Sequence, residues 1–147
     1  MNQKNQKWLC ALLIGLNLAF IWGNSVLPGD DSGAMSGWLL RLLGFLPNSE
    51  QAHTILRKIA HFSEFACLGL LMGWMRILVK DKPALSLLGC GLAAACVDET
   101  IQYFVPGRAS SLIDVWIDAA GFATGLMILA IGYTILKRKY LTEETDL

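Results

Sequence analysis

The sequence predicts an all-α, polytopic membrane protein with four transmembrane helices, one short interfacial helix on the outer leaflet and both termini in the cytoplasm. The first observation behind this prediction is composition: of 147 residues, 54% are hydrophobic and only 16% are charged. Soluble domains carry about a quarter charged residues. The second is the presence of four apolar runs, each long enough to cross a hydrocarbon core, which takes about 20 residues. The third is the placement of lysine and arginine. We therefore expect a single membrane domain over residues 1–147.

The predicted spans cover residues 8–26, 59–79, 84–105 and 112–136. The first span follows Lys4 and Lys7, as the apolar part of a secretory signal would. No cleavage site of small residues comes after it, so we interpret it as a retained span. Pro83 favours a helix start for the third span, because proline is well suited to the first turn of a helix.

The orientation follows from the positively charged residues, because positive residues in short loops stay in the cytoplasm. One side of the four-span arrangement carries Lys4, Lys7, Arg76, Lys80, Lys82, Lys137, Arg138 and Lys139. The other side carries Arg41, Arg57, Lys58 and Arg108. The prediction is that both termini are cytoplasmic, while loop 27–58 and turn 106–111 face outward.

The outer loop contains an apolar pattern of its own. The segment GDDSGAMSGWLLRLLGFLPNSE begins with helix-capping Asp and Ser and continues with apolar residues at helical spacing. A helix over residues 34–46 is too short to span, which favours an interfacial helix. Whether it lies on the bilayer or caps the helix bundle stays open, because an amphipathic pattern does not say what its apolar face contacts.

Charge and cysteine placement exclude other classes of protein. The formal net charge is zero, so nothing indicates a nucleic-acid partner. The cysteines lie in apolar runs without a CxxC pair, which favours buried thiols over a disulfide framework or a zinc site: Cys10, Cys67, Cys90 and Cys96. No cofactor and no metal is predicted.

Polar residues occur at one depth in three of the predicted spans and in the turn between the last two. They are Lys58, His61, Glu64, Asp98, Glu99, Gln102, Arg108, Asp114 and Asp118. Asp114 and Asp118 are four residues apart and share a helix face. Ionisable residues at membrane depth are costly and indicate a functional site by default. We expect a polar cluster in the outer half of the bilayer.

Each member of this set also has a structural interpretation. Arg108 could pair with Asp114 or with an anionic lipid head, and Asp114 could serve as the acid in the first turn of a helix. Gln102 and Asp98 could form hydrogen bonds between helices, and His61 alone could be a packing residue. The small-residue pairs Gly69/Gly73 and Gly121/Gly125 permit close helix approach in lipid, which favours convergence of the polar faces.

Three stretches carry a resemblance to a known family. KIAHFSEF, DETIQYFVPGR and DVWIDAAGFATG, from about Lys58 to Gly125, resemble the VanZ-like family of small bacterial membrane proteins. FIWGNSVLPGDDSG is similar to the N-terminal part of that family. The resemblance implies a multi-pass protein of the bacterial cytoplasmic membrane. It also implies a link to the cell envelope and to antibiotic resistance, because the founding member is associated with low-level teicoplanin resistance. Asp118 stands where the family often shows Asn, and the resemblance supplies no catalytic residues.

The polar residues allow more than one activity. The first hypothesis is binding of an amphiphilic ligand, either a lipoglycopeptide or a lipid-linked precursor, with its head at the carboxylates. Arg108 and Lys58 would orient anionic parts of the ligand. The partners expected are thus membrane lipid and this ligand, with no nucleic acid, and a homo-oligomer stays open.

The alternative is a membrane-embedded enzyme acting on an outer-leaflet lipid or cell-wall precursor. His61, Glu64, Glu99 and Asp114 would supply acid/base chemistry or oxygen ligands to a divalent metal. Against it, no G-x-S-x-G nucleophile motif and no H-x-x-x-H spacing occurs. An ion-coupled transporter is the least favoured hypothesis, because acids confined to the outer half give no path through the membrane.

Overall fold

A computed structural model describes the chain apart from residues 1, 30–36, 39–48, 80–83 and 146–147. The elements of the described part are all helical: α1 (Gln3–Val26), α3 (Glu50–Val79), α4 (Ala84–Phe104) and α5 (Leu112–Thr145). The predicted all-α class is confirmed. The predicted interfacial helix over residues 34–46 lies outside the described residues, apart from Gly37 and Trp38.

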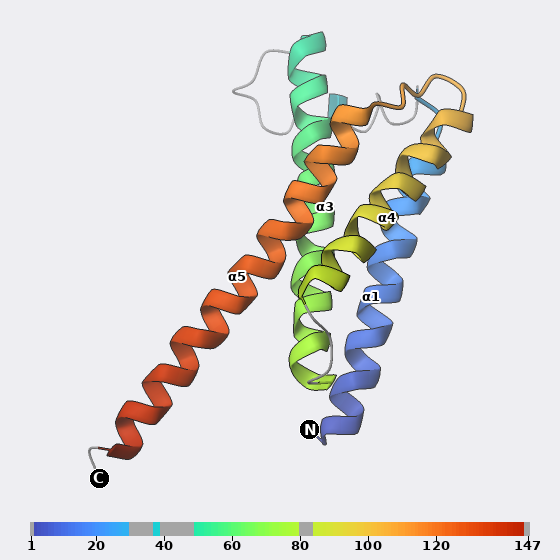
Figure 1. Cartoon of the computed structure of the whole chain (residues 1–147). Helices are drawn as coiled ribbons and strands as arrows, with labels where there is room; N and C mark the ends of the chain where they lie inside the picture. The colour runs from blue at the N-terminus through green and yellow to red at the C-terminus, as the bar shows by residue number, and fades with distance from the viewer. Residues whose placement is uncertain (1, 30–36, 39–48, 80–83, 146–147) are drawn as a thin grey trace.

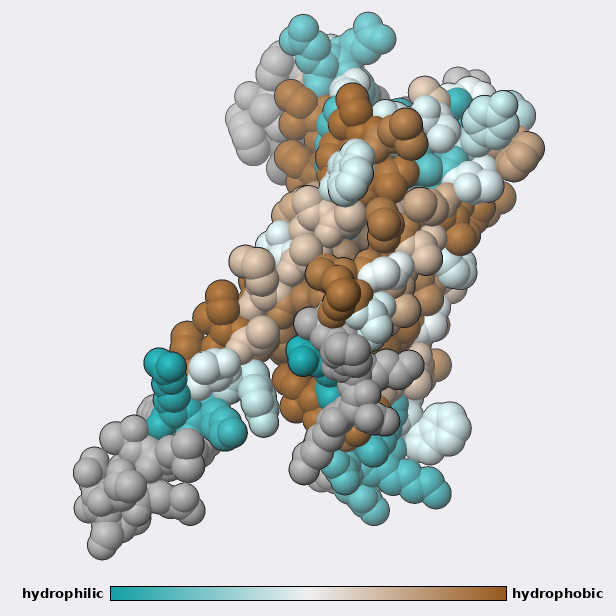
Figure 2. Space-filling view, in the orientation of Figure 1, coloured by the Kyte–Doolittle hydropathy of each residue, from teal (hydrophilic) through white to brown (hydrophobic). Residues whose placement is uncertain are grey.

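Three of these helices are long and apolar enough to cross a membrane: α1, α3 and α5, the last over Leu112–Arg138. Large apolar side chains are exposed along all of them, as expected for surfaces that contact lipid tails. Figure 2 shows apolar side chains across the middle of the visible face and hydrophilic side chains gathered toward its ends. The chain is therefore a membrane protein.

The start of α3 differs from the prediction, which placed residues 50–58 in an outer loop. The helix begins at Glu50 because Ser49 caps it: the Ser49 hydroxyl accepts a hydrogen bond from the Ala52 N–H at 3.2 Å. Glu50 adds a negative charge to the first turn, where the helix dipole favours one. The apolar pattern marks only the part of a helix that contacts lipid, so it missed the polar turns before residue 59.

The helices are packed so that α3 contacts α5 most extensively, while α1 packs on α3 and α4, and α4 packs on α5. Figure 1 shows both termini toward one end of the molecule and the α4–α5 turn at the other. Toward its C-terminus, α5 diverges from the remaining helices. The buried core therefore lies on the side of the α4–α5 turn and the middle of α3, where Phe65, Leu68 and Phe122 are fully buried.

Glycines set the close approach of α3 and α5. A Cβ atom added at Gly121 would meet the backbone of Phe62, and one at Gly125 would meet the backbone of Ala66 and Leu70. Gly69 on α3 faces the carbonyl oxygen of Phe122 in the same way. These backbone contacts bring the polar residues one or two turns away on each helix toward one another.

The cysteines are free, but the prediction of buried thiols is right only for Cys10, whose thiol donates to the Leu71 carbonyl oxygen at 3.3 Å. Cys67, Cys90 and Cys96 are exposed. The sequence prediction failed because an apolar run in a membrane protein faces lipid as readily as protein.

Candidate functional site

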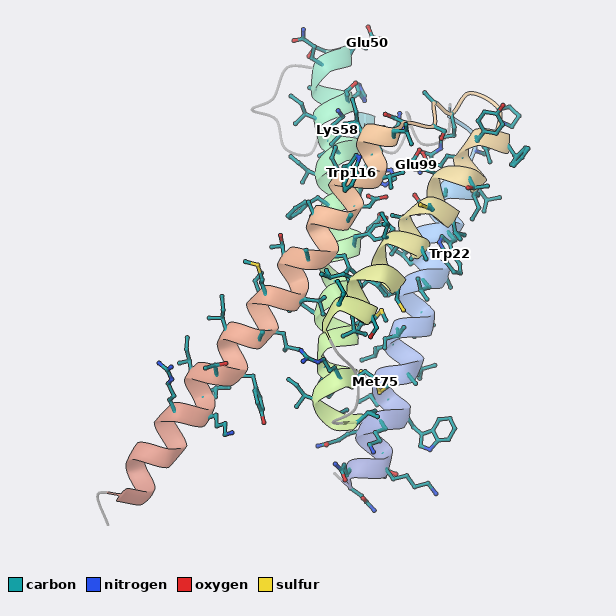
Figure 3. The ribbon with its side chains drawn as sticks, viewed as in Figure 1. Trp22, Glu50, Lys58, Met75, Glu99 and Trp116 are labelled. Carbon is teal, nitrogen blue, oxygen red and sulfur yellow. The ribbon has the colours of Figure 1, made fainter. Side chains whose placement is uncertain are left out.

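The candidate site is a group of polar side chains near the end of the bundle that carries the α4–α5 turn. Lys58, Glu99 and Trp116 lie toward this end, whereas Met75 lies toward the opposite one (Figure 3). All four described helices contribute a polar residue to the group: Ser25 from α1, His61 from α3, Asp98 from α4 and Asp118 from α5.

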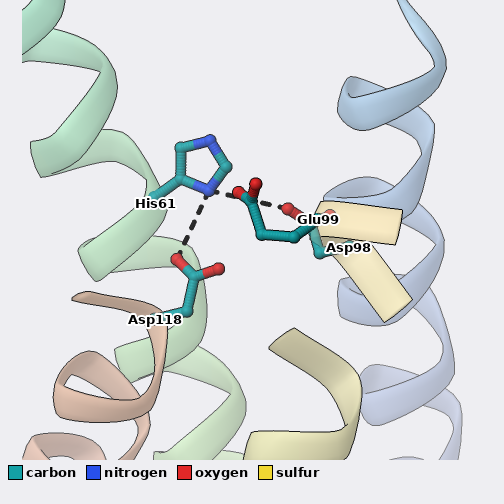
Figure 4. A group of neighbouring side chains, drawn as sticks. All are labelled: His61, Asp98, Glu99 and Asp118. Carbon is teal, nitrogen blue, oxygen red and sulfur yellow. Dashed lines mark ion pairs between the residues drawn. The ribbon is translucent and has the colours of Figure 1, made fainter. Parts of the chain in front are cut away.

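Four of the predicted residues form the centre of the group, here called the four-residue cluster: His61, Asp98, Glu99 and Asp118 (Figure 4). One nitrogen or oxygen atom from each lies within 4.8 Å of the others. Asp98 and Asp118 are 0% exposed, and Glu99 is 4% exposed. Burying this many carboxylates is costly unless protein groups or a bound ion compensate their charge.

His61 is the basic residue within ion-pairing distance of these carboxylates in the described part of the chain. Its Nδ1 lies 3.3 Å from Asp118 Oδ1 and 3.6 Å from Asp98 Oδ2. A proton on Nδ1 can be donated in a hydrogen bond to only one of these two oxygens at a time. The imidazole therefore compensates only part of the negative charge around it.

Each carboxylate oxygen of Asp98 accepts a hydrogen bond from a neighbouring side chain. The Ser25 hydroxyl donates to Asp98 Oδ1 at 2.5 Å, and the Gln102 amide donates to Asp98 Oδ2 at 2.8 Å. Ser25 is 2% exposed and Gln102 is 0% exposed, so these bonds form away from water. The Asp98 carboxylate thus joins α1 to α4, as hydrogen-bonding side chains between membrane helices do.

Only one of the two carboxylate oxygens of Glu99 has a hydrogen-bond partner among the described residues. Its Oε2 accepts a hydrogen bond from the Ser111 N–H at 2.8 Å, just before α5 begins. Ser111 also caps α5, because its hydroxyl accepts from the Ile113 N–H at 3.2 Å. Glu99 thereby lies at the positive end of the α5 dipole, with Asp114 in the first turn.

Several buried polar atoms of the site have no hydrogen-bond partner among the described residues: Glu99 Oε1, Gln102 Oε1, Asp114 Oδ1, His61 Nδ1 and both carboxylate oxygens of Asp118. Buried polar atoms in proteins are nearly always paired, and those that are not deserve an explanation. Those of His61, Glu99 and Asp118 belong to the four-residue cluster, which indicates an unfilled hydrogen-bonding or ligating capacity there.

Arg108 has a different partner from the one predicted. The sequence VPGR forms a turn in which the Arg108 N–H bonds the Val105 carbonyl oxygen at 3.2 Å, with Pro106 second and Gly107 third at φ +74°. This is the pattern of a type II turn, which places glycine at the left-handed position. The turn directs Arg108 back toward the end of α1.

The Arg108 guanidinium bonds backbone carbonyls there and not Asp114. Its Nε donates to the Leu27 carbonyl oxygen at 3.0 Å, and Nη2 donates to that of Asn24. Helix ends leave carbonyl groups unpaired, and a cation is favoured beside them. Burial lowers the pKa of Arg108 below its usual value, but arginine remains charged at neutral pH. Arg108 therefore fastens the α4–α5 turn to α1.

The other predicted residues lie at the edge of the cluster. Glu64 accepts a hydrogen bond from the Asn24 amide at 3.0 Å. Lys58 and Asp114 are half-buried, Lys58 one turn before His61 on α3. A pocket lined by Glu50, Gln51, Thr54 and Ile55 lies toward the start of α3, within about two turns of Lys58, and does not include these residues.

Two site residues were missed by the sequence analysis. Asn24 and Ser25 lie near the end of the first predicted span, residues 8–26, and were not included among the predicted polar residues. The sequence does contain an indication of their role. Both are polar residues at the depth assigned to the cluster, and the first span had no other residue in the predicted polar set.

Replacing Ser25 by alanine should lower stability, because it removes a donor from a buried carboxylate. A buried acceptor left without its partner costs about 1–3 kcal/mol. Thermal unfolding in detergent would measure the change. Ser63→Ala is the matched control, since the exposed Ser63 hydroxyl bonds only the Ile59 carbonyl of its own helix. Equal unfolding temperatures for the two variants would contradict the assigned role of Ser25.

Comparison with known proteins identifies the family. No curated protein and no solved structure matches the chain. The family model described as VanZ/LLP1 matches residues 8–135, a range that includes all four described helices over most of their length and every residue of the polar group. The chain therefore belongs to the VanZ/LLP1 family.

Proposed function

We propose that this VanZ-like protein binds an amphiphilic ligand at the outer leaflet of the bacterial cytoplasmic membrane and so contributes to resistance to glycopeptides of the teicoplanin type. The observation that carries the proposal is the buried polar group at the end of the bundle opposite both termini, with acceptor atoms that no described residue satisfies. Family membership supplies the link to teicoplanin.

The proposed orientation has four spans and cytoplasmic termini. It is supported by the distribution of lysine and arginine and by the common position of the two termini at one end of the bundle (Figure 1). As the fourth span we take α4, whose 21 residues reach about 32 Å at a rise of 1.5 Å per residue. This length matches the hydrocarbon core of a bilayer, about 30 Å.

Aromatic residues support an interfacial position for the site. Tyr103 and Phe104 at the end of α4 are 73% and 77% exposed, and Trp116 in the second turn of α5 is 69% exposed. Aromatic side chains are enriched where the bilayer meets water. They lie at the same end as the polar group, so a ligand anchored by an acyl chain would meet both.

The ligand would be held at two places. Its cationic or sugar-bearing head would hydrogen-bond to Asp114, which has an unpaired acceptor oxygen, and would lie beside the carboxylate of Glu99. Half-buried Lys58 lies at the edge, where it would orient anionic groups. The acyl chain would lie along the exposed apolar side chains of Leu112 and Ile113. Teicoplanin carries such a chain, which fits the family link.

A second candidate is a membrane-embedded enzyme that acts on an outer-leaflet lipid or a cell-wall precursor. The contact of 3.3 Å between His61 and Asp118 favours it, because a histidine positioned by a carboxylate is a common general base. In an enzyme, Glu99→Gln should abolish turnover while ligand still binds. In a binding protein, the same change should lower the affinity for the ligand, and no product should form with either protein.

The experiment that tests the proposal measures teicoplanin and vancomycin susceptibility in a sensitive Gram-positive host. Empty vector, wild type, Glu99→Gln and the control Glu50→Gln are compared at matched membrane levels. Glu50 is an exposed carboxylate in the first turn of α3. We expect protection that is selective for teicoplanin, retained by Glu50→Gln and lost in Glu99→Gln. Absence of protection by well-expressed wild type would refute the proposal.

A further inference from the structure

The four-residue cluster combines one imidazole with three carboxylates contributed by three helices. Imidazole nitrogen suits transition metals such as zinc and iron, and carboxylate oxygen suits manganese and magnesium. A set with both donor types fits a divalent transition-metal ion. Four such atoms lie within 4.8 Å of one another and would move closer together around one ion, since Zn²⁺ binds nitrogen and oxygen at about 2.0–2.2 Å.

The unpaired atoms of the cluster point independently to a ligand. Asp118 is 0% exposed, and neither of its oxygens has a hydrogen bond from the described residues. Glu99 is 4% exposed, and its Oε1 is unpaired although Oε2 is held by Ser111. Gln102 and Ser25 satisfy Asp98 but reach neither of these oxygens. A bound cation would contact the oxygens that the protein leaves free.

A protonated His61 paired with Asp118 does not account for the same atoms. That proton would satisfy Asp118 Oδ1 at 3.3 Å, but it would leave Asp118 Oδ2 and Glu99 Oε1 without a partner. It would also place one positive charge among three buried carboxylates, while the Arg108 guanidinium is bonded to backbone carbonyls. A divalent ion with neutral His61 compensates more of the charge and uses His61 Nδ1 as a ligand.

We propose that His61, Asp98, Glu99 and Asp118 form a binding site for one divalent transition-metal ion of the manganese or zinc type. The surrounding groups already orient the ligands: Ser25 and Gln102 fix Asp98, and the Ser111 N–H fixes Glu99. Hydrogen bonds of this kind to ligating carboxylates are typical of metal centres. The site ties α3, α4 and α5 together at the outward end of the bundle.

Metal content of the purified protein tests this inference without any antibiotic. The protein in detergent is stripped with EDTA, incubated with Mn²⁺, Zn²⁺ or Mg²⁺ alone, desalted and analysed by mass spectrometry for metal per chain. We expect about one equivalent of Mn²⁺ or Zn²⁺ in wild type. Mg²⁺ should bind less, because it favours all-oxygen sites that keep several waters. The proposal would be overturned if the wild-type protein retained neither Mn²⁺ nor Zn²⁺.

The metal content of substituted proteins tests which residues bind the ion. Asp118→Asn and His61→Ala should lose the bound metal, while Glu50→Gln should retain it because its carboxylate lies turns away on the surface of α3. A second readout follows folding: the metal should raise the unfolding temperature of wild type but not that of Asp118→Asn. Equal metal content in wild type and a folded Asp118→Asn protein would also overturn the proposal.

Discussion

Gly125→Leu should strongly destabilise the folded state. A side chain at this position would collide with the backbone of Ala66 and Leu70 on α3, and backbone cannot move aside as a flexible side chain can. Overpacking of side chains alone costs about 1–3 kcal/mol. Because separating α3 from α5 also disperses the polar cluster, we expect a loss at the upper end of that range or beyond. Size-exclusion chromatography and thermal unfolding in detergent would measure it.

Gly132→Leu is the matched control for this prediction. Gly132 lies on the same helix, and a Cβ atom added there would meet nothing within 4 Å. Removing a helical glycine should even favour helix formation slightly, by up to about 1 kcal/mol. If Gly125→Leu and Gly132→Leu gave proteins of equal stability, the close packing of α3 on α5 would be wrong.

Arg108→Ala should destabilise the end of the bundle that carries the α4–α5 turn and reduce function at the same time. The change removes the bonds to the carbonyl oxygens of Asn24 and Leu27, which then have no partner from the α4–α5 turn. Hydrogen bonds from charged donors contribute about 1.5–3 kcal/mol. Arg108→Lys should recover only part of this, because an ammonium group does not reproduce the two directed contacts of a guanidinium.

Protease accessibility of the α4–α5 turn and thermal unfolding would check this prediction. Lys137→Ala serves as the control, since Lys137 is an exposed cation on α5, far from the turn in sequence. If Arg108→Ala unfolds at the temperature of wild type, the guanidinium does not hold the turn to α1.

The helices were predictable because each contains a long run of apolar residues, which in α1, α3 and α5 is long enough to cross a membrane. The start of α3 was not, because polar residues that continue a helix beyond the bilayer have no apolar period, and the capping role of Ser49 depends on geometry. GxxxG pairs are common, but here Gly121 and Gly125 do face α3 backbone. Which pairs of helices contact one another could be read only from the structure.

The part of the candidate site that consists of ionisable residues within apolar runs was predictable from the sequence. His61, Asp98, Glu99 and Asp118 were singled out as ionisable groups in apolar surroundings, and the structure brings them together. The partner of Arg108 was not predictable, because a backbone carbonyl has no residue type that a sequence could reveal. Ser25 was missed for a related reason: its importance comes from the register of α1 against α4.

The most direct test of the central claim measures binding of teicoplanin to the purified protein in lipid nanodiscs, with vancomycin as the comparison ligand. We predict that wild type and Glu50→Gln bind teicoplanin in preference to vancomycin. Glu99→Gln should bind it about tenfold more weakly, a change that corresponds to about 1.4 kcal/mol. The central claim would be contradicted if Glu99→Gln, folded and reconstituted equally well, bound teicoplanin as tightly as wild type, or if wild type did not bind it.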